Sequence, residues 1–286
     1  MSKKVIDLLS ARLRRYKTPT DKHVLNSVKE ILQELALLGL SRSGFFKKAA
    51  FHGGSAMRIF FGLDRFSEDL DFCLQRPDPD YSLHNVIPPL LNELQSWGVD
   101  VEVVERSKAS QAVKKAFLKT SSLGAELNLS HPLHRAQKLV IKLEVDTNPP
   151  LGANCISSLC EFPLDFYVTT HDLQSMFSGK LHAILCRAYE KGRDWYDLME
   201  YFSRRITPNY PFLQAALAQS GPFKSVTNFK ELRKDWLVEQ VDKKIGAVNV
   251  DNLRKEALPF IEDESRVALW DREYFRTKLE RWAQAS

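Results

Sequence analysis

The sequence predicts a mixed α+β protein, in which an α/β lobe with a mixed sheet flanked by helices precedes an α-helical lobe. Strand-like and helix-like runs alternate over roughly residues 45–168, which is typical of an α/β lobe. Helical periodicity then continues almost to the end of the chain. With 286 residues, 44% of them hydrophobic, the chain is long enough to fill two cores. We therefore expect a helical segment at 1–44, an α/β domain at 45–168 and a helical domain at 169–286.

The first half of the chain carries elements of both kinds. Apolar residues at helical spacing predict a helix over 23–38, and the glycines at 39 and 44 end it. "FKKAAFHGG" predicts a short strand that runs into a tight turn, and the small residues after Gly54 predict a helix that reaches Phe61. "RFSEDLDFCL" predicts the next strand. Beyond it we expect a helix at 84–97 and strands at 99–105, 124–130 and 138–146.

The last third of the chain is predicted to be helical, without a sheet. A long helical run begins at "THDLQSMFSGKLHAILC", and the segments "FKELRKDWLVEQVDKKI" and "WDREYFRTKLERWAQ" are amphipathic. Gly192 is a candidate helix end in this region. Asp194 would then serve as the N-cap of the helix that follows.

Composition excludes several classes of protein. No apolar run approaches the roughly 18 residues of a membrane span, and the basic start lacks the apolar stretch of a signal peptide, so we expect a cytoplasmic protein without membrane contact. The four cysteines form no C-x-x-C pair, which predicts reduced thiols and no zinc site. A net charge of +5 permits a nucleic-acid partner without requiring one.

The stretch "RFSEDLDF" places acids beside residues that favour burial. Because alternate side chains of a strand point to opposite faces, Arg65, Ser67, Asp69 and Asp71 are expected on one face. The other face would carry the apolar Phe66, Leu70 and Phe72, with Glu68 as the exception near the start of the strand. Two carboxylates about 7 Å apart along a strand repel each other unless a positive charge lies between them. A divalent cation such as Mg²⁺, which prefers oxygen ligands and accepts substrate phosphates as further ligands, would resolve this repulsion.

A second strand repeats the alternation. In "LVIKLEVD", Lys142, Glu144 and Asp146 share one face and three apolar residues share the other. The third acid of a carboxylate cluster would come from this strand, with Glu144 preferred and Asp146 as the alternative. Lys142 is a candidate nucleotide contact on the same face.

A glycine turn lies upstream of these acids. Gly53, Gly54 and Ser55 stand where a helix begins, and the N–H groups of a first helical turn attract phosphate. No G-K-[ST] follows, so this is not a Walker A loop. The 13 residues between Ser55 and Asp69 are enough for a helix that returns the acids to the turn. The combination predicts a site for a metal ion and a nucleotide phosphate.

The order of glycine turn, D-x-D and later acid resembles the nucleotidyltransferase fold of the DNA polymerase β superfamily. "FHGGSAMRIFFGLDRFSEDLDF", Lys180 and "KGRDWYDL" are similar, more specifically, to the AbiEii/AbiGii toxin family, found in type IV toxin–antitoxin and abortive-infection systems. The similarity covers about residues 45–200, so it implies a nucleotidyltransferase catalytic domain at 45–168.

The resemblance also implies residue roles. Gly53, Gly54 and Ser55 would hold the nucleotide phosphates, while Asp69, Asp71 and Glu144 would bind Mg²⁺ or Mn²⁺. Ser67 and Asp69 match the family's S-x-D, and Lys180 matches its later catalytic lysine. The aspartate of the last motif is Asp194, or else Asp197. Arg58 and Arg65 are candidate phosphate contacts, although either could equally pair with an acid.

The implied reaction transfers NMP from an NTP to an acceptor hydroxyl, with Glu144 assisting removal of the hydroxyl proton. The resemblance implies an RNA acceptor, in particular the 3′ end of tRNA, growth arrest as the outcome, and an antitoxin that forms no stable complex with the toxin. One alternative keeps the chemistry but uses a small molecule or a protein as acceptor. Another is a catalytically silent binding module on the same fold.

Overall fold

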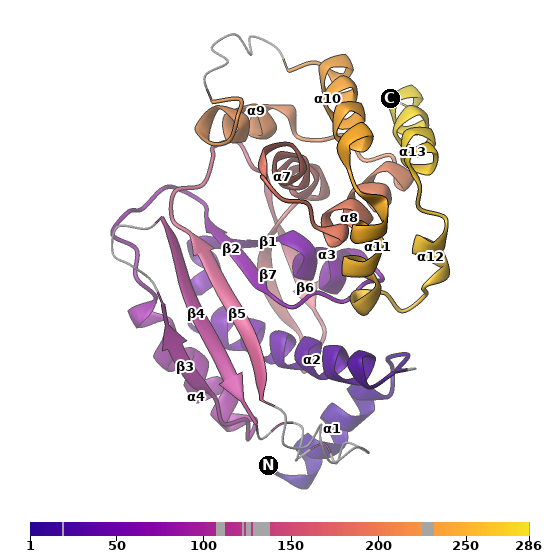
Figure 1. Ribbon diagram of the computed structural model, residues 1–286. Helices are drawn as coiled ribbons and strands as arrows, with labels where there is room; N and C mark the ends of the chain where they lie inside the picture. The colour runs from indigo at the N-terminus through magenta and orange to yellow at the C-terminus, as the bar shows by residue number, and fades with distance from the viewer. Residues whose placement is uncertain are drawn as a thin grey trace. The chain divides into compact units, whose positions relative to one another are not determined.

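The computed structural model describes residues 1–18, 20–106, 112–121, 123, 127, 138–224 and 232–285. Its chain forms two compact units, each drawn with its own elements in Figure 1. The first unit consists of Met1–Gly62, Phe66–Pro149 and Cys155–Thr170. The second consists of Leu63–Arg65, Pro150–Asn154 and His171–Ser286. Residues 1–44, which we expected to form a segment of their own, are thus part of the first unit.

The first unit contains one mixed sheet, as predicted. Within the described residues seven strands lie in the order β3-β4-β5-β2-β1-β7-β6. β2 runs parallel to β5 and antiparallel to β1, whereas β4 runs antiparallel to both β3 and β5. The strands are β1 (Ala49–His52), β2 (Leu70–Leu74), β3 (Glu102–Glu105), β4 (Val113–Thr120), β5 (Leu139–Asp146), β6 (Cys155–Cys160) and β7 (Phe166–His171).

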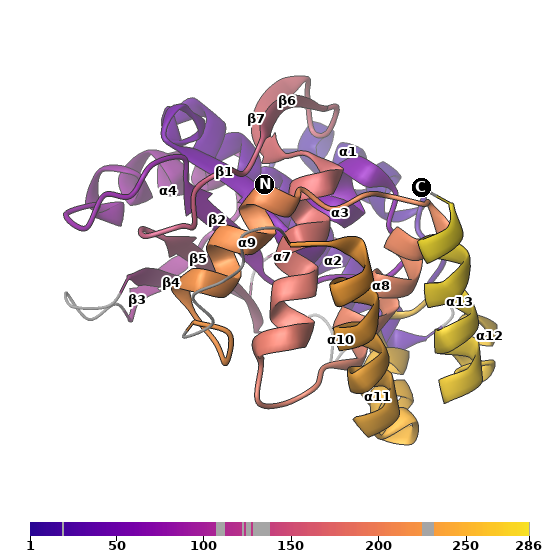
Figure 2. The same cartoon turned by 90° about the horizontal axis from the view of Figure 1, so that it is seen from above.

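Helices cover one face of this sheet. The first unit contains α1 (Lys3–Leu13), α2 (Asp21–Arg42), α3 (Gly53–Phe61), α4 (Ile87–Ser96) and two short 3₁₀ turns, η1 (Phe45–Lys47) and η2 (Leu83–Asn85). α2 is buried along most of its length and packs closely on α4, where a Cβ at Gly39 would lie 2.8 Å from Leu90 Cδ1. Figure 2 shows α4 on one side of β3, β4 and β5, with no helix of the first unit drawn against their other side in the described part of the chain.

The second unit is helical. It contains α7 (Leu173–Cys186), α8 (Gly192–Ser203), α9 (Tyr210–Gln219), α10 (Lys234–Ala247), α11 (Val250–Ala257), η3 (Leu258–Phe260), α12 (Ser265–Ala268) and α13 (Arg272–Gln284). Gly192 begins α8 and does not end α7, which corrects our expectation. A Cβ at this position would lie 1.9 Å from the carbonyl oxygen of Leu253, so only glycine allows α11 to pack here. No helix that the structure describes is both long and apolar enough to cross a membrane.

The strand expected from residue 65 is shorter than predicted, because β2 begins only at Leu70. Ser67 and Glu68 before it contact α2, and Arg65 forms only an isolated antiparallel bridge with Ile261. Gln33 donates to the carbonyl oxygen of Ser67 at 3.1 Å, and Lys29 pairs with Glu68 at 2.8 Å. The common strand face proposed for residues 65 to 71 is therefore wrong for Arg65 and Ser67.

The strand expectations had mixed outcomes elsewhere. The alternation predicted for β5 is confirmed, since Ile141, Leu143 and Val145 are buried and the polar residues between and after them are half-buried, while Val140 is exposed. β4, β6 and β7 were not anticipated. The strand expected at 124–130 lies outside the described residues, apart from position 127.

Candidate active site

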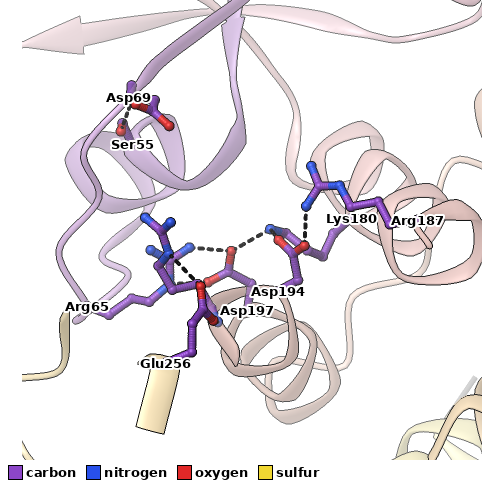
Figure 3. Close-up of polar contacts among 9 residues, drawn as sticks. Ser55, Arg65, Asp69, Lys180, Arg187, Asp194, Asp197 and Glu256 are labelled. Carbon is purple, nitrogen blue, oxygen red and sulfur yellow. Dashed lines mark hydrogen bonds and ion pairs between the residues drawn. The ribbon is translucent and has the colours of Figure 1, made fainter. Parts of the chain in front are cut away.

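The glycine turn connects β1 to α3 and touches the start of β2. Gly53 has φ +79°, a left-handed conformation that favours glycine, and His52 before it provides no side-chain cap. Ser55 is buried, and its hydroxyl donates a hydrogen bond to the carbonyl oxygen of Asp69 (Figure 3). The hydroxyl therefore links the turn to the acidic segment. The backbone N–H groups of the first helical turn can then donate to an anion.

The acids on β2 and β5 lie side by side. Asp71 is directly across from Glu144 in the parallel ladder, whereas Asp146 is across from Cys73. Asp146 also accepts a hydrogen bond from the backbone N–H of Asn148 at 2.9 Å. Glu144 is therefore the acid of β5 that lies next to Asp71.

Two lysines hold the carboxylate of Glu144. Lys115 on β4 approaches one oxygen at 2.9 Å, and Lys142 approaches the other at 2.7 Å. Burial works against ionisation of Glu144, but the hydrogen bonds from Lys142 and Lys115 lower its pKa. Burial likewise disfavours the charge of Lys142, yet Glu144, together with Asp69 and Asp71, raises the pKa of Lys142.

A buried ion network occupies the second unit, and Figure 3 shows its members on α7, α8 and the segment before residue 66. Arg65 makes two hydrogen bonds of 2.6 Å to the carboxylate of Asp197. Lys180 lies 2.6 Å from Asp194 and 2.8 Å from Asp197, and Arg187 binds the other oxygen of Asp194. We call these five residues the ion network.

These contacts bear on alternatives that the sequence left open for Arg65, Arg58 and Asp194. The guanidinium of Arg65 forms a buried ion pair with Asp197, so the geometry supports this ion pair over a nucleotide contact. Arg58 likewise pairs with Glu30 at 2.9 Å. Asp194 does not cap α8, because Lys191 precedes that helix without a side-chain cap and the Asp194 carboxylate binds Lys180 and Arg187.

Residues 35–281 match the family model described as "Nucleotidyl transferase AbiEii toxin, Type IV TA system". The chain belongs to this family. It is therefore a nucleotidyltransferase of the AbiEii toxin family. Among curated protein sequences none matches the chain.

Two solved structures resemble this AbiEii-family protein. MenT4, a nucleotidyltransferase toxin from Mycobacterium tuberculosis, shares 17% identity with a TM-score of 0.56, and the alignment covers 98% of this chain and 94% of MenT4. JHP933 from Helicobacter pylori shares 16% identity with a TM-score of 0.46, covering 99% and 92%. The likeness to MenT4 shows the nucleotidyltransferase fold.

The acids of the AbiEii-family chain fit a divalent cation only in part. Among the residues that the structure describes, no three His, Cys, Asp or Glu side chains form a group that could hold a metal ion. The three-carboxylate cluster that we expected is therefore not preformed, because Lys115 and Lys142 hold Glu144. Asp69 and Asp71 still fit Mg²⁺, which binds one or two carboxylates and completes its shell with water and substrate phosphates.

The first prediction concerns the glycine turn. A Cβ at Gly53 would lie 2.9 Å from Asp71 Oδ2, too close for the carboxylate to keep its place. We expect Gly53→Ala to cost about 1–2 kcal/mol of stability through backbone strain and to reduce nucleotidyl transfer at least about tenfold. Denaturant unfolding and a transfer assay would measure the two effects.

Gly62→Ala is the matched control for this prediction. Gly62 has φ +67°, and nothing lies within 4 Å of its added Cβ. It should lose similar stability while keeping its transfer activity. Equal loss of activity in both variants would show that transfer does not depend on the close approach of Gly53 to the Asp71 carboxylate.

The second prediction concerns acid stability. Burial disfavours the charge of Asp194, but Lys180 and Arg187 outweigh it and lower the pKa of Asp194 from 3.8 to about 2. A carboxylate whose pKa is lowered in the folded state stabilises the protein at pH values above its unfolded pKa. This stability, here about 2 kcal/mol, is lost as the pH falls from roughly 5 to 2. Urea unfolding across this range should show a shallower loss for Asp194→Asn than for wild type; parallel curves would contradict it.

Sequence reasoning missed Lys115 and the pairing of Arg65 with Asp197. The first carried a weak signal, since the burial of β4 alternates but the letters of "VKKAFLKT" do not alternate polar and apolar residues. The second carried no local signal, because Arg65 and Asp197 are 132 residues apart in the chain.

Proposed function

We propose that this AbiEii-family nucleotidyltransferase transfers NMP from an NTP to a hydroxyl of RNA, with the 3′ end of tRNA as acceptor, and thereby arrests growth. The observation that carries the proposal is the contact between the glycine turn and the acids. The hydrogen bond from Ser55 to the carbonyl oxygen of Asp69, and the approach of the Asp71 carboxylate to Gly53, support a site in which the start of α3 lies beside these acids. A helix start next to carboxylates suits a metal-bound triphosphate, because the N–H groups of the helix bind phosphate oxygens and the carboxylates bind the metal ion.

Asp69 and Asp71 would hold Mg²⁺ or Mn²⁺ together with the phosphates. When bound there, such a cation would supply Lewis-acid chemistry, making an acceptor hydroxyl more acidic and offsetting the charge of the leaving pyrophosphate. The rest of the rate enhancement would come from positioning and fixed charge, as in phosphoryl transfer generally.

The protein's own groups would divide the remaining work. The N–H groups of Gly53, Gly54 and Ser55 bind phosphate oxygens, and the ammonium of Lys142 faces the same carboxylates and offsets phosphate charge. Glu144, whose pKa is lowered by the lysines, is a weak proton acceptor in this arrangement. We therefore assign it to orienting Lys142 and not to removing the acceptor proton, which revises our earlier expectation.

Ser67, Lys180 and Asp194 remain proposed catalytic residues on the strength of the motif resemblance. Ser67 lies two residues before Asp69, in the segment bound to α2 through its own carbonyl oxygen. Lys180 and Asp194 form an ion pair within the ion network. Variants that lose transfer while keeping the unfolding midpoint would support a catalytic role, and variants that only unfold earlier would contradict it.

An antitoxin encoded alongside is the proposed partner, acting without a stable complex. The experiment that tests the proposed function incubates the protein with labelled NTPs, Mg²⁺ and total tRNA. Label on tRNA supports the proposal. Label on protein or on a small molecule would identify that molecule as the acceptor in place of RNA. The absence of any label, with the protein folded, would contradict the proposed reaction.

A further inference from the structure

We infer that the outer face of β4 and β5, next to the acids, binds the single-stranded end of the acceptor RNA. This outer face consists of the half-buried or exposed residues Lys115, Phe117 and Lys119 on β4 and Val140 and Lys142 on β5, with Arg106 beside them. The inference rests on the proposed function and adds to it a surface for the acceptor.

The register shows that these residues share a face with the catalytic acids. In one cross-strand row Asp71, Glu144 and Lys115 lie on β2, β5 and β4. The next row on the same face pairs Lys142 with Phe117, and the third pairs Val140 with Lys119. Each step of two residues along a strand covers about 6.6–6.8 Å, so the face extends about 13 Å away from the row of Asp71.

Strand order places the acids between two different surfaces. The order β4-β5-β2-β1 puts the glycine turn, which follows β1, on one side of Asp71 and the outer face on the other. If the turn binds the triphosphate of the donor, the outer face is the side from which a second substrate can approach. An acceptor strand lying along β4 and β5 would bring its terminal hydroxyl toward Asp71.

The chemistry of the outer face matches a nucleic-acid strand. The guanidinium of Arg106 lies over the ring of Phe117, 5.4 Å from its centroid. Lys115 and Lys142 flank this pair, and Lys119 follows two residues beyond it. An aromatic ring and an arginine offer stacking surfaces to a base, and surrounding lysines bind the backbone, which is the arrangement of single-strand binding proteins.

Equilibrium binding of a labelled twelve-nucleotide single-stranded RNA with a 3′-hydroxyl tests the inference without any transfer step. We expect Phe117→Ala to weaken binding about tenfold or more through lost stacking. Phe117→Leu, which preserves apolar volume and therefore the fold, should lose a similar amount. Lys119→Ala should flatten the dependence of log affinity on log salt by about 0.7, the value for one phosphate contact.

Tyr167→Ala and Lys243→Ala are the matched controls. Tyr167 is an exposed ring on β7 of the same sheet, and Lys243 is an exposed lysine on α10. Both should bind the RNA as wild type does. Wild-type protein that binds no RNA, or outer-face variants that bind as tightly as the controls, would overturn the inference.

Steady-state transfer separates this inference from the proposed function. Outer-face variants should raise the KM for tRNA and leave the KM for NTP unchanged. A raised KM for NTP would instead assign Phe117 to the donor nucleotide and overturn the inference. Failure of the proposed function would show as no transfer by wild type, while the RNA-binding measurement would still decide the outer face.

Discussion

Asp71→Asn and Asp69→Asn should each reduce nucleotidyl transfer by about a thousandfold or more, equivalent to about 4 kcal/mol of transition-state stabilisation. An amide keeps the size of the side chain but removes the negative charge that would hold a divalent cation against the phosphates. Asp71 lies across from Glu144 and beside the start of α3, so its loss removes the centre of the proposed site. Transfer of labelled NMP at saturating Mg²⁺ is the measurement.

Asp146→Asn is the matched control for these substitutions. Asp146 lies on the adjacent strand, two residues beyond Glu144, and its carboxylate accepts from the N–H of Asn148, a role that an asparagine oxygen can fill. The variant should keep nearly full transfer activity. Activity of both the Asp69→Asn and the Asp71→Asn variant would rule out the proposed mechanism. An inactive Asp146→Asn would make Asp146 the third acid again.

The acidic strands were predictable because their pattern is local. Alternation in "LVIKLEVD" alone places Glu144 and Lys142 on one face, and the glycine turn predicts the start of a helix. What the sequence could not reveal is which charges pair. Lys115 reaches Glu144 only through the antiparallel pairing of β4 with β5, and no local rule states that register. In the described part of the chain this pairing holds Glu144 on two lysines instead of in a preformed three-carboxylate group.

The start of β2 shows a second limit of local patterns. Alternation continues upstream to Arg65, but alternation describes side chains and not hydrogen-bond partners. Residues 67 and 68 are bound by Gln33 and Lys29 of α2, and Arg65 is bound by Asp197 of α8. Tertiary contacts from distant parts of the chain therefore ended a strand that periodicity would have extended.

The motif "KGRDWYDL" has a structural role that its charges explain. Asp194 and Asp197 are both buried in the ion network, where Lys180 reaches both of them. A buried charge without its partner is costly, so each member depends on the others. Substitutions at Asp194 and at Asp197 therefore have to be compared for their effect on stability before either is assigned as the last motif residue.

Asp197→Ala should lower the free energy of unfolding of the second unit by about 3–5 kcal/mol, because it leaves Arg65 buried without its carboxylate. Tryptophan fluorescence in urea suits this measurement, since four of the five tryptophans lie in the second unit. Glu239→Ala, which breaks the exposed pair with Lys243, should cost less than about 1 kcal/mol. Asp197→Asn, which keeps an oxygen for the Arg65 guanidinium, should fall between these two. A loss for Asp197→Ala no larger than that of Glu239→Ala would show that the ion network does not stabilise the fold.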